Sequence, residues 1–162
     1  MARAVLPLSA DAAWALVTDV RRHADWVPLT RIEAAQTLGT GDTFTAVSGP
    51  TARRGGPGLV DRMTVLHSEP PTARAAGIAR YRKDGPLLRG GAGIEVRSLG
   101  PDWCEVTWVE EIGARGLPTA VTDLVSRPSS RLMLAIVLRR LRAEVTSAAG
   151  PGRRAARNES SS

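Results

Sequence analysis

The 162-residue chain contains few cysteines, histidines and aromatic residues, and each shortage excludes a class of protein. Its one cysteine, Cys104, cannot form an internal disulfide and cannot by itself build a cysteine-based metal site. The two histidines, His23 and His67, do not form a closely spaced pair, so we predict no metal centre. One phenylalanine and one tyrosine are too few for the stacking platform of a protein that binds single-stranded nucleic acid.

Long apolar runs and nucleotide-binding loops are also missing from the sequence. No stretch approaches the roughly 20 apolar residues that span a membrane, so we predict no membrane span. Residues 1–11 lack the apolar core of a secretory signal, which predicts a cytoplasmic location. The sequence has neither a phosphate-binding Walker loop nor a Gly-x-Ser-x-Gly elbow. We therefore predict a protein without a cofactor.

The net charge of +6 results from 22 basic and 16 acidic residues, and only one of the basic residues, Lys83, is a lysine. A basic chain can indicate a nucleic-acid partner. Here, however, three of the arginines (Arg153, Arg154 and Arg157) lie close to the C-terminal end. Others fall on outward positions of the strands predicted below, where acids of neighbouring strands can face them. We therefore predict no nucleic-acid partner.

The chain is predicted to begin with a strand and two short helices. Residues 3–8 are a short apolar run that predicts the first strand. Residues 9–19 have apolar side chains at helical spacing, and Ser9 is a favourable N-cap. Residues 21–28 predict a second short helix, which ends at Pro28.

Two ring-bearing residues of this second helix have different predicted environments. His23 has charged neighbours, Arg21, Arg22 and Asp25, so we predict an exposed imidazole. Trp26 is expected to pack between the helices, because a buried indole contributes a large apolar area.

Between residues 30 and 114 the helical period is replaced by alternation of apolar and polar residues, the pattern of half-buried strands. Turns rich in glycine and proline separate the segments. We predict strands over residues 30–38, 42–49, 59–69, 72–83, 86–99 and 104–112. Because the turns are short, these strands should form an antiparallel meander.

Residues 117–148 return to helical spacing, with an interruption expected at Pro128. One stripe of this helix is apolar and consists of Leu134, Val137, Leu138, Leu141 and Val145. Arg139, Arg140 and Arg142 fall beside or opposite the stripe. Such a stripe packs on a large apolar surface, and the sheet is the only candidate. Residues 149–162 are polar and predict a disordered tail, which leaves residues 1–148 as a single domain.

Several local patterns resemble those of one superfamily. They are residues 13–28 (AWALVTDVRRHADWVP), 61–71 (DRMTVLHSEPP), 87–96 (LLRGGAGIEV), 106–112 (VTWVEEI) and 131–141 (RLMLAIVLRRL). With the order of elements, they resemble the SRPBCC or START-like superfamily of the birch-pollen allergen, in its bacterial polyketide cyclase/dehydrase branch. The resemblance implies an α+β helix-grip fold. In this fold a seven-stranded curved antiparallel sheet wraps around a long C-terminal helix, with two short helices after the first strand. It also implies an internal cavity that holds a lipid, a polyketide or a similar apolar small molecule.

Alternation sorts the predicted strands into residues that face this cavity and residues that face solvent. Seven side chains are predicted to line the cavity: Phe44, Asp61, Met63, Tyr81, Trp108 and Glu110 on the sheet and Val137 on the helix. Apolar walls with a few placed polar groups are typical of small-molecule pockets. Gly77 and Ala79, which alternation also places inside, are predicted to leave volume unfilled.

The inward-facing acids are open to two interpretations. In the first, Glu110 hydrogen-bonds a ligand or acts as an acid or base with a raised pKa. In the second, it reaches solvent at the cavity mouth or pairs with an arginine. Asp61 has the same alternatives. His67 lies at a strand end, where it either faces the cavity or has a structural or exposed role.

Two functions are compatible with these predictions. The first is binding of a hydrophobic small molecule in the cavity, as a carrier or sensor. The alternative is an enzyme of the polyketide cyclase/dehydratase type, in which pocket acids polarise a carbonyl or move a proton. A cyclase should have several converging polar groups, and the sequence offers only two or three, which favours binding. A partner-binding module that uses the outer face of the sheet or the tail is a third class.

Overall fold

The structure, a computed structural model, describes residues 1–114 and 132–147. These residues contain one antiparallel sheet of seven strands in the order β1-β7-β6-β5-β4-β3-β2. The strands are β1 (Ala2–Leu6), β2 (Thr30–Glu33), β3 (Thr43–Ser48), β4 (Leu59–Glu69), β5 (Gly77–Asp84), β6 (Leu88–Gly100) and β7 (Trp103–Ala114). Strands β2 to β7 form a meander and β1 is added beside β7, so the predicted sheet is confirmed.

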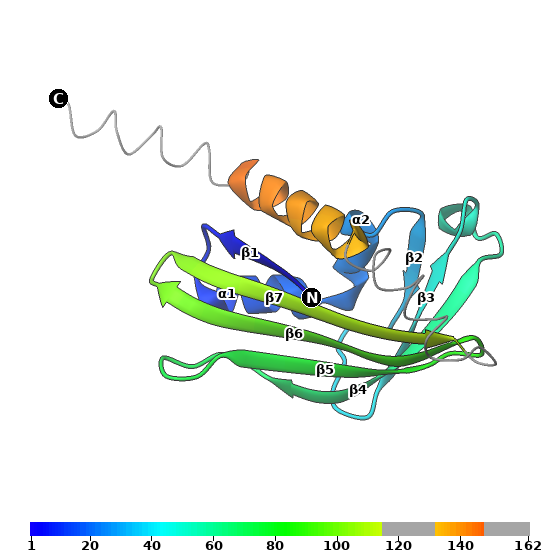
Figure 1. Cartoon of the computed structure of the whole chain (residues 1–162), viewed down its shortest axis with the longest axis horizontal. Coiled ribbons are helices and arrows are strands. Elements are labelled where there is room, and N and C mark those ends of the chain that lie inside the picture. The colour runs from blue at the N-terminus through cyan, green and yellow to red at the C-terminus, as the bar shows by residue number, and fades with distance from the viewer. Residues whose placement is uncertain (115–131, 148–162) are drawn as a thin grey trace.

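Short helices lie between β1 and β2, and a longer helix follows the sheet. The first group consists of α1 (Ala10–Thr18), the 3-10 turn η1 (Val20–Arg22) and α2 (His23–Trp26). A second 3-10 turn, η2 (Ala52–Arg54), lies between β3 and β4. The C-terminal helix covers residues 132–147. In Figure 1 the sheet curves around the side on which α2 and the C-terminal helix (orange) lie. This is the predicted α+β helix-grip fold.

The apolar stripe of the C-terminal helix packs into the core as predicted. Its five residues, Leu134, Val137, Leu138, Leu141 and Val145, are buried in one cluster with α1 and the inner residues of the sheet. The three arginines Arg139, Arg140 and Arg142 are exposed. The predicted helical residues 117–131 and the predicted tail, 149–162, lie outside the described residues. The domain boundary at residue 148 therefore stays a prediction.

A polar cluster fastens the C-terminal helix to α2. The Trp26 side chain is almost completely buried, and its indole N–H donates a hydrogen bond to Glu144 Oε2 at 2.8 Å. Arg22 forms an ion pair with the other oxygen of Glu144. Arg140 donates to the Trp26 carbonyl oxygen at 3.3 Å. Trp26 is therefore a buried packing residue as predicted, and its one polar group is satisfied by the C-terminal helix.

Helix α1 begins at the predicted cap and fills one end of the inner face of the sheet. The Ser9 hydroxyl accepts a hydrogen bond from the Ala12 amide at 3.2 Å. Trp14 approaches Gly77 so closely that a Cβ at this glycine would lie 2.8 Å from the indole ring. Ala79 is fully buried. The prediction of unfilled volume at Gly77 and Ala79 is therefore wrong, because α1 packs over this end of the sheet.

His23 is buried, which contradicts the prediction of an exposed imidazole. Its Nε2 lies 2.8 Å from the Val17 carbonyl oxygen, and its ring centre lies 4.9 Å from that of Trp108. Burial lowers the pKa of His23, which favours a neutral ring whose Nε2 proton is donated to Val17. The charged neighbours in sequence do not predict its environment, because a helix turns successive side chains to different faces.

Two strands are shorter than predicted by four or more residues, and a third contains a bulge. Strand β2 ends at Glu33 instead of residue 38, and β5 begins at Gly77 instead of residue 72. The pairing of β4 with β5 shifts register between Val65 and His67. This bulge reverses the alternation, so the His67 side chain is 49% exposed and lies 3.4 Å from Glu69. Of the two alternatives for His67, the exposed one is confirmed.

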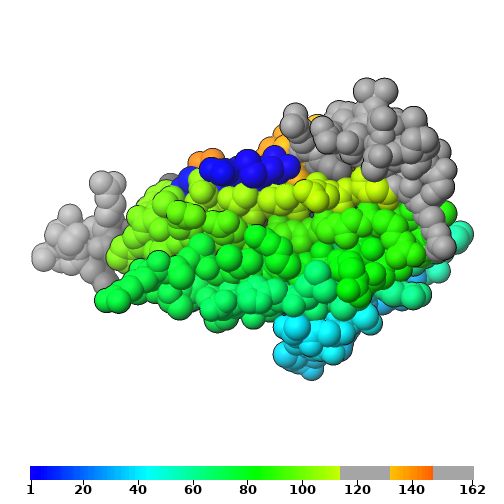
Figure 2. All heavy atoms as spheres, turned by 60° about the horizontal axis from the view of Figure 1, so that its bottom comes forward, coloured from blue at the N-terminus to red at the C-terminus, as the bar shows by residue number. Residues whose placement is uncertain are grey.

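The outer face of the sheet is polar. Figure 2 shows β4 to β7 side by side, with the segment around residue 40 (cyan) projecting at one edge. Arginines at the predicted outward positions are exposed: Arg62, Arg80, Arg82 and Arg97. Arg82 pairs with Asp84 at 2.8 Å and Arg97 with Glu95 at 3.0 Å. These acids lie on the same strand as their arginine, two residues away. Arg97 also lies opposite Glu105 of β7 in the register, which is the cross-strand arrangement that the sequence predicts.

The buried stripe should provide most of the stability that the C-terminal helix contributes. Leu141→Ala, at a fully buried residue, should lower the free energy of unfolding by about 2–5 kcal/mol, because it removes buried methyl groups and leaves a cavity. Leu132→Ala, in the same helix at a residue that is 65% exposed, should change it by less than about 0.5 kcal/mol. Urea denaturation measures both variants. Equally small effects would contradict the docking of this helix on the sheet.

Candidate ligand-binding cavity

A cavity of about 270 Å³ lies between the inner face of the sheet and the beginning of the C-terminal helix. All seven residues predicted to line a cavity are on its wall: Phe44, Asp61, Met63, Tyr81, Trp108, Glu110 and Val137. Most of the other wall residues are apolar, among them Ile32, Ala46, Leu88, Ala92, Ile112 and Leu134. That the seven residues bind a ligand stays a prediction.

Strand alternation and register bring the charged residues of the wall together. Asp61 and Met63 lie two positions apart on β4 and therefore share a face, and Met63 pairs with Lys83 on β5. Glu110, on β7, pairs with Ala92 on the intervening strand β6. Lys83 and Glu110 are thus separated by one strand. On β6, Lys83 pairs with Gly90 and Glu110 pairs with Ala92, so small residues separate the lysine from β7.

Lys83 forms ion pairs with both acids of the wall. Its ammonium nitrogen lies 2.9 Å from Glu110 Oε1 and also pairs with Asp61 Oδ2. The Lys83 side chain is 2% exposed, against 14% for Asp61 and 19% for Glu110. An ammonium group has three hydrogens to donate, and its third neighbour is Met63 Sδ at 3.9 Å. The buried cation is therefore fully surrounded by acceptors.

The environment of this cluster shifts the pKa of two of its members. Burial raises the pKa of Asp61; Lys83 offsets part of the rise and Glu110 adds to it. Burial alone would lower the pKa of Lys83, but the combined attraction of Glu110 and Asp61 outweighs burial and raises it. The lysine is therefore held as a cation, while the ionised form of Asp61 is disfavoured relative to water.

The two alternatives stated for the inward acids are combined in the structure. Glu110 and Asp61 line the cavity and also pair with a cation, which is a lysine and not an arginine. Lys83 itself is missed by sequence reasoning, although two signals point to it. It is the only lysine in the chain, and the alternation that places Ala79 and Tyr81 inside places residue 83 inside as well.

Three further polar residues of the wall are absent from the sequence prediction: His23, Thr30 and Ser48. The Thr30 hydroxyl donates to the Pro28 carbonyl oxygen at 3.1 Å, and the Ser48 and Thr30 hydroxyl oxygens lie 2.7 Å apart. These groups are therefore satisfied within the protein. Among the described residues, the buried side-chain atom that lacks a hydrogen bond is Asp61 Oδ1.

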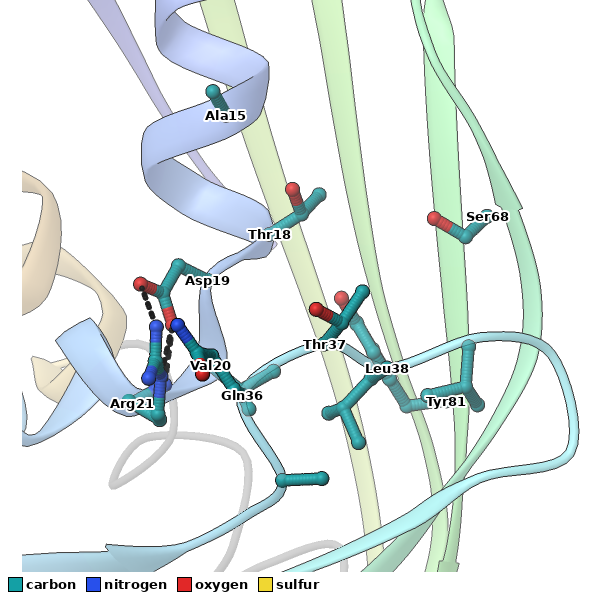
Figure 3. Close-up of a pocket in the computed structure, with 12 residues that line it drawn as sticks. Ala15, Thr18, Asp19, Val20, Arg21, Gln36, Thr37, Leu38, Ser68 and Tyr81 are labelled. Carbon is teal, nitrogen blue, oxygen red and sulfur yellow. Dashed lines mark hydrogen bonds and ion pairs between the residues drawn. The ribbon is translucent and has the colours of Figure 1, made fainter.

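A second pocket, of about 250 Å³, lies between α1, β4, β5 and the segment that follows β2. Figure 3 shows its wall: Thr18, Asp19 and Arg21 at the end of α1 and in η1, Gln36, Thr37 and Leu38 after β2, and Ser68 and Tyr81 on the sheet. Asp19 accepts hydrogen bonds from Arg21 Nε at 3.0 Å and Nη2 at 3.1 Å. Polar side chains make up a larger share of this wall than of the first.

Tyr81 lines both pockets and lies at their boundary. Its ring meets the Phe44 ring edge to face, with ring centres 5.7 Å apart. Burial raises the pKa of Tyr81 to about 12, so the hydroxyl stays protonated at neutral pH.

The described residues also bear on metals and membranes. In residues 1–114 and 132–147, no group of His, Cys, Asp and Glu side chains is arranged to hold a metal ion. None of the helices there combines the length and the apolar character needed to cross a membrane.

Cys104 is buried, and burial raises the pKa of its thiol to about 11. The cytoplasmic location and the absence of a cofactor and of a nucleic-acid partner stay predictions.

Comparisons with known proteins find likeness in structure. No family model and no curated protein matches the sequence. A START superfamily protein from Mycobacterium smegmatis shares 13% identity at a TM-score of 0.63, over 90% of this chain and 95% of its own. A Streptomyces aromatase/cyclase shares 16% identity at a TM-score of 0.55, over 87% of this chain and 92% of its own. Norcoclaurine synthase from Thalictrum flavum, in complex with dopamine and hydroxybenzaldehyde, shares 15% identity at a TM-score of 0.57, over 88% of this chain and 84% of its own.

These likenesses establish the class of fold. Each extends over most of both chains, so the shared part is the whole domain and not a local motif. The chain therefore has the START-like helix-grip fold that its sequence patterns resemble. A shared fold does not determine the activity, which has to be argued from the cavity.

Removing the buried cation should destabilise the fold strongly. Lys83→Met leaves Asp61 and Glu110 without their shared partner, so the free energy of unfolding at neutral pH should fall by about 3–5 kcal/mol. Arg82→Met, which removes an exposed cation from the adjacent position, should lower it by about 1 kcal/mol or less. Urea denaturation compares the two variants. Equal stability of both would mean that water already solvates the two acids.

The raised pKa of Asp61 predicts a stability that depends on pH. A carboxyl group whose pKa is higher in the folded chain stabilises the fold at low pH. That contribution is lost as the pH rises from the ordinary pKa of an aspartate, 3.8, through the raised pKa of Asp61 in the folded chain. Asp61→Asn removes this titration, so the variant should lose less stability between about pH 4 and pH 7 and be at least as stable as the wild type at neutral pH.

Thermal unfolding across this pH range measures the effect. Asp102→Asn makes the same change at an exposed position and should follow the wild-type profile. Parallel profiles for Asp61→Asn and the wild type would contradict the assignment of the pH dependence to Asp61.

Proposed function

We propose that this chain binds a compact hydrophobic small molecule in its cavity of about 270 Å³, as a carrier or a sensor. The observation that carries the proposal is a mostly apolar cavity wall on which the charged side chains of the described residues form one cluster. Water against an apolar wall is unfavourable, and an apolar molecule that replaces it removes apolar surface from water.

The cavity volume limits the size of the ligand. Pockets that bind small molecules measure about 300–1,000 Å³, and this cavity lies close to the lower end of that range. A molecule of one or two rings therefore fits better than an extended lipid chain. Burying about 200 Å² of apolar surface contributes about 5 kcal/mol before the costs of association are subtracted. We expect a Kd between the micromolar and the millimolar range.

An enzyme of the polyketide cyclase/dehydratase type is the second candidate. It is favoured by the convergence of Lys83, Asp61 and Glu110 on the cavity and by the presence of an aromatase/cyclase among the proteins with this fold. In this candidate, Lys83 polarises a substrate carbonyl and a carboxylate accepts the proton from the adjacent carbon. The binding function ranks first because the lysine already has three neighbours within the protein.

A fluorescent probe and a variant that fills the cavity test the binding function. Dimethylaminonaphthalene, an uncharged two-ring probe, should bind the wild type and become more emissive in the apolar cavity. Ala46→Phe, at a buried wall position, should raise its Kd by about tenfold or more, because the new ring takes up ligand volume. Ala143→Phe makes the same change at an exposed position of the C-terminal helix and should leave the Kd unchanged. Unchanged affinity in Ala46→Phe would place the binding elsewhere.

Mass spectrometry under non-denaturing conditions separates the two candidates. The chain purified from cells should retain a small apolar compound, which denaturation releases for identification. A carrier or sensor returns this compound unchanged after incubation. Conversion of the compound by the wild type, with loss of conversion in Asp61→Asn, would establish the enzyme instead.

A further inference from the structure

Asp61 uses only one of its two carboxylate oxygens within the protein. Oδ2 accepts a hydrogen bond from Lys83, whereas Oδ1 is buried and accepts none. An unpaired buried acceptor costs about 1–3 kcal/mol, and more when it is charged. Buried polar groups therefore nearly always have a partner, and an exception requires an explanation.

The neighbours of Asp61 on the wall do not supply the missing donor. Its cross-strand partner is Ala46, and the next inward residue along β4 is Met63, neither of which has a side-chain donor. The ammonium of Lys83 is shared among Asp61 Oδ2, Glu110 and the Met63 sulfur. Asp61 also belongs to the lining of the cavity. Among the described residues none donates a hydrogen bond to Oδ1, and the cavity is the open space that Asp61 borders.

We infer that the ligand of this cavity carries a hydroxyl group, of a phenol or an alcohol, that donates a hydrogen bond to Asp61 Oδ1. The inference rests on the proposed function and specifies the class of ligand. The remainder of the ligand contacts the apolar wall, in which Phe44, Trp108 and Met63 are the large members.

A hydroxyl group suits this position better than a carbonyl or an ammonium group. A carbonyl oxygen has no hydrogen to donate and would face Oδ1 with like partial charge. An ammonium group would place a second cation on the carboxylate that already binds Lys83, and its transfer from water into an apolar cavity is costly. A hydroxyl group supplies the one hydrogen that Oδ1 lacks at the smallest desolvation cost.

Two compounds of similar size distinguish donors from acceptors. Isothermal titration calorimetry of the wild type should show that 4-ethylphenol binds about tenfold or more tightly than acetophenone, which accepts but cannot donate. Phenethylamine tests the cationic alternative and should bind more weakly than 4-ethylphenol. Tighter binding of phenethylamine would overturn the inference.

Asp61→Asn should reverse the preference. The amide oxygen keeps the hydrogen bond from Lys83, so the amide NH2 takes the place of Oδ1 and turns an acceptor into a donor. The preference for 4-ethylphenol, measured as the ratio of its affinity to that of acetophenone, should therefore fall by about tenfold or more. Asp102→Asn makes the same chemical change at an exposed residue outside the cavity and should keep the wild-type preference. Thermal unfolding confirms that both variants are folded.

The outcomes separate this inference from the proposed function. Equal binding of 4-ethylphenol and acetophenone to the wild type, with both weakened by Ala46→Phe, would mean that water satisfies Oδ1. The cavity would then bind ligands without selecting a hydroxyl group, so the inference fails and the proposed function stands. A preference unchanged in Asp61→Asn also overturns the inference. Failure of both compounds and of the two-ring probe to bind the wild type would overturn the proposed function as well.

Discussion

A buried ammonium group ties the inner face of the sheet together. Lys83 binds one carboxylate on β4 and another on β7, and so connects two strands that do not touch each other. Each buried ion alone would cost several kcal/mol, and the shared lysine offsets that cost for both acids. The cluster leaves one buried acceptor without a partner, Asp61 Oδ1, beside a mostly apolar wall. In the ligand complex proposed above, this acceptor orients the bound molecule.

The cavity owes its location to the length of α1 as much as to the residues around it. Helix α1 covers the end of the sheet that contains Gly77 and Ala79, and the contact with Trp14 leaves no room there. Beyond the end of this helix, the described residues that face the sheet across the cavity include His23 and Val27, and Leu134 and Val137 of the C-terminal helix. Tyr81 lines both pockets because it lies between the part of the inner face near α1 and the part near the C-terminal helix.

Much of the fold could be predicted from the sequence, because alternation is a strong signal in a sheet with one buried face. It assigned Phe44, Met63 and Trp108 to the inner face correctly. The failures occurred where two rules competed. At residue 83 alternation indicates the inner face, but the charge of a lysine suggests the outer one. The two acids that pair with this lysine can be identified only when the strand register is known. At Gly77 a small residue suggests space, whereas it permits the close approach of a helix.

The burial of Lys83 restricts the amine chemistry of the chain. It is the only lysine in the sequence, and its side chain is 2% exposed. An amine-reactive reagent therefore does not reach this amine on the folded molecule. Acetylation or cross-linking at the lysine requires the inner face of the sheet to open first. The extent of lysine labelling thus measures how often the cavity opens.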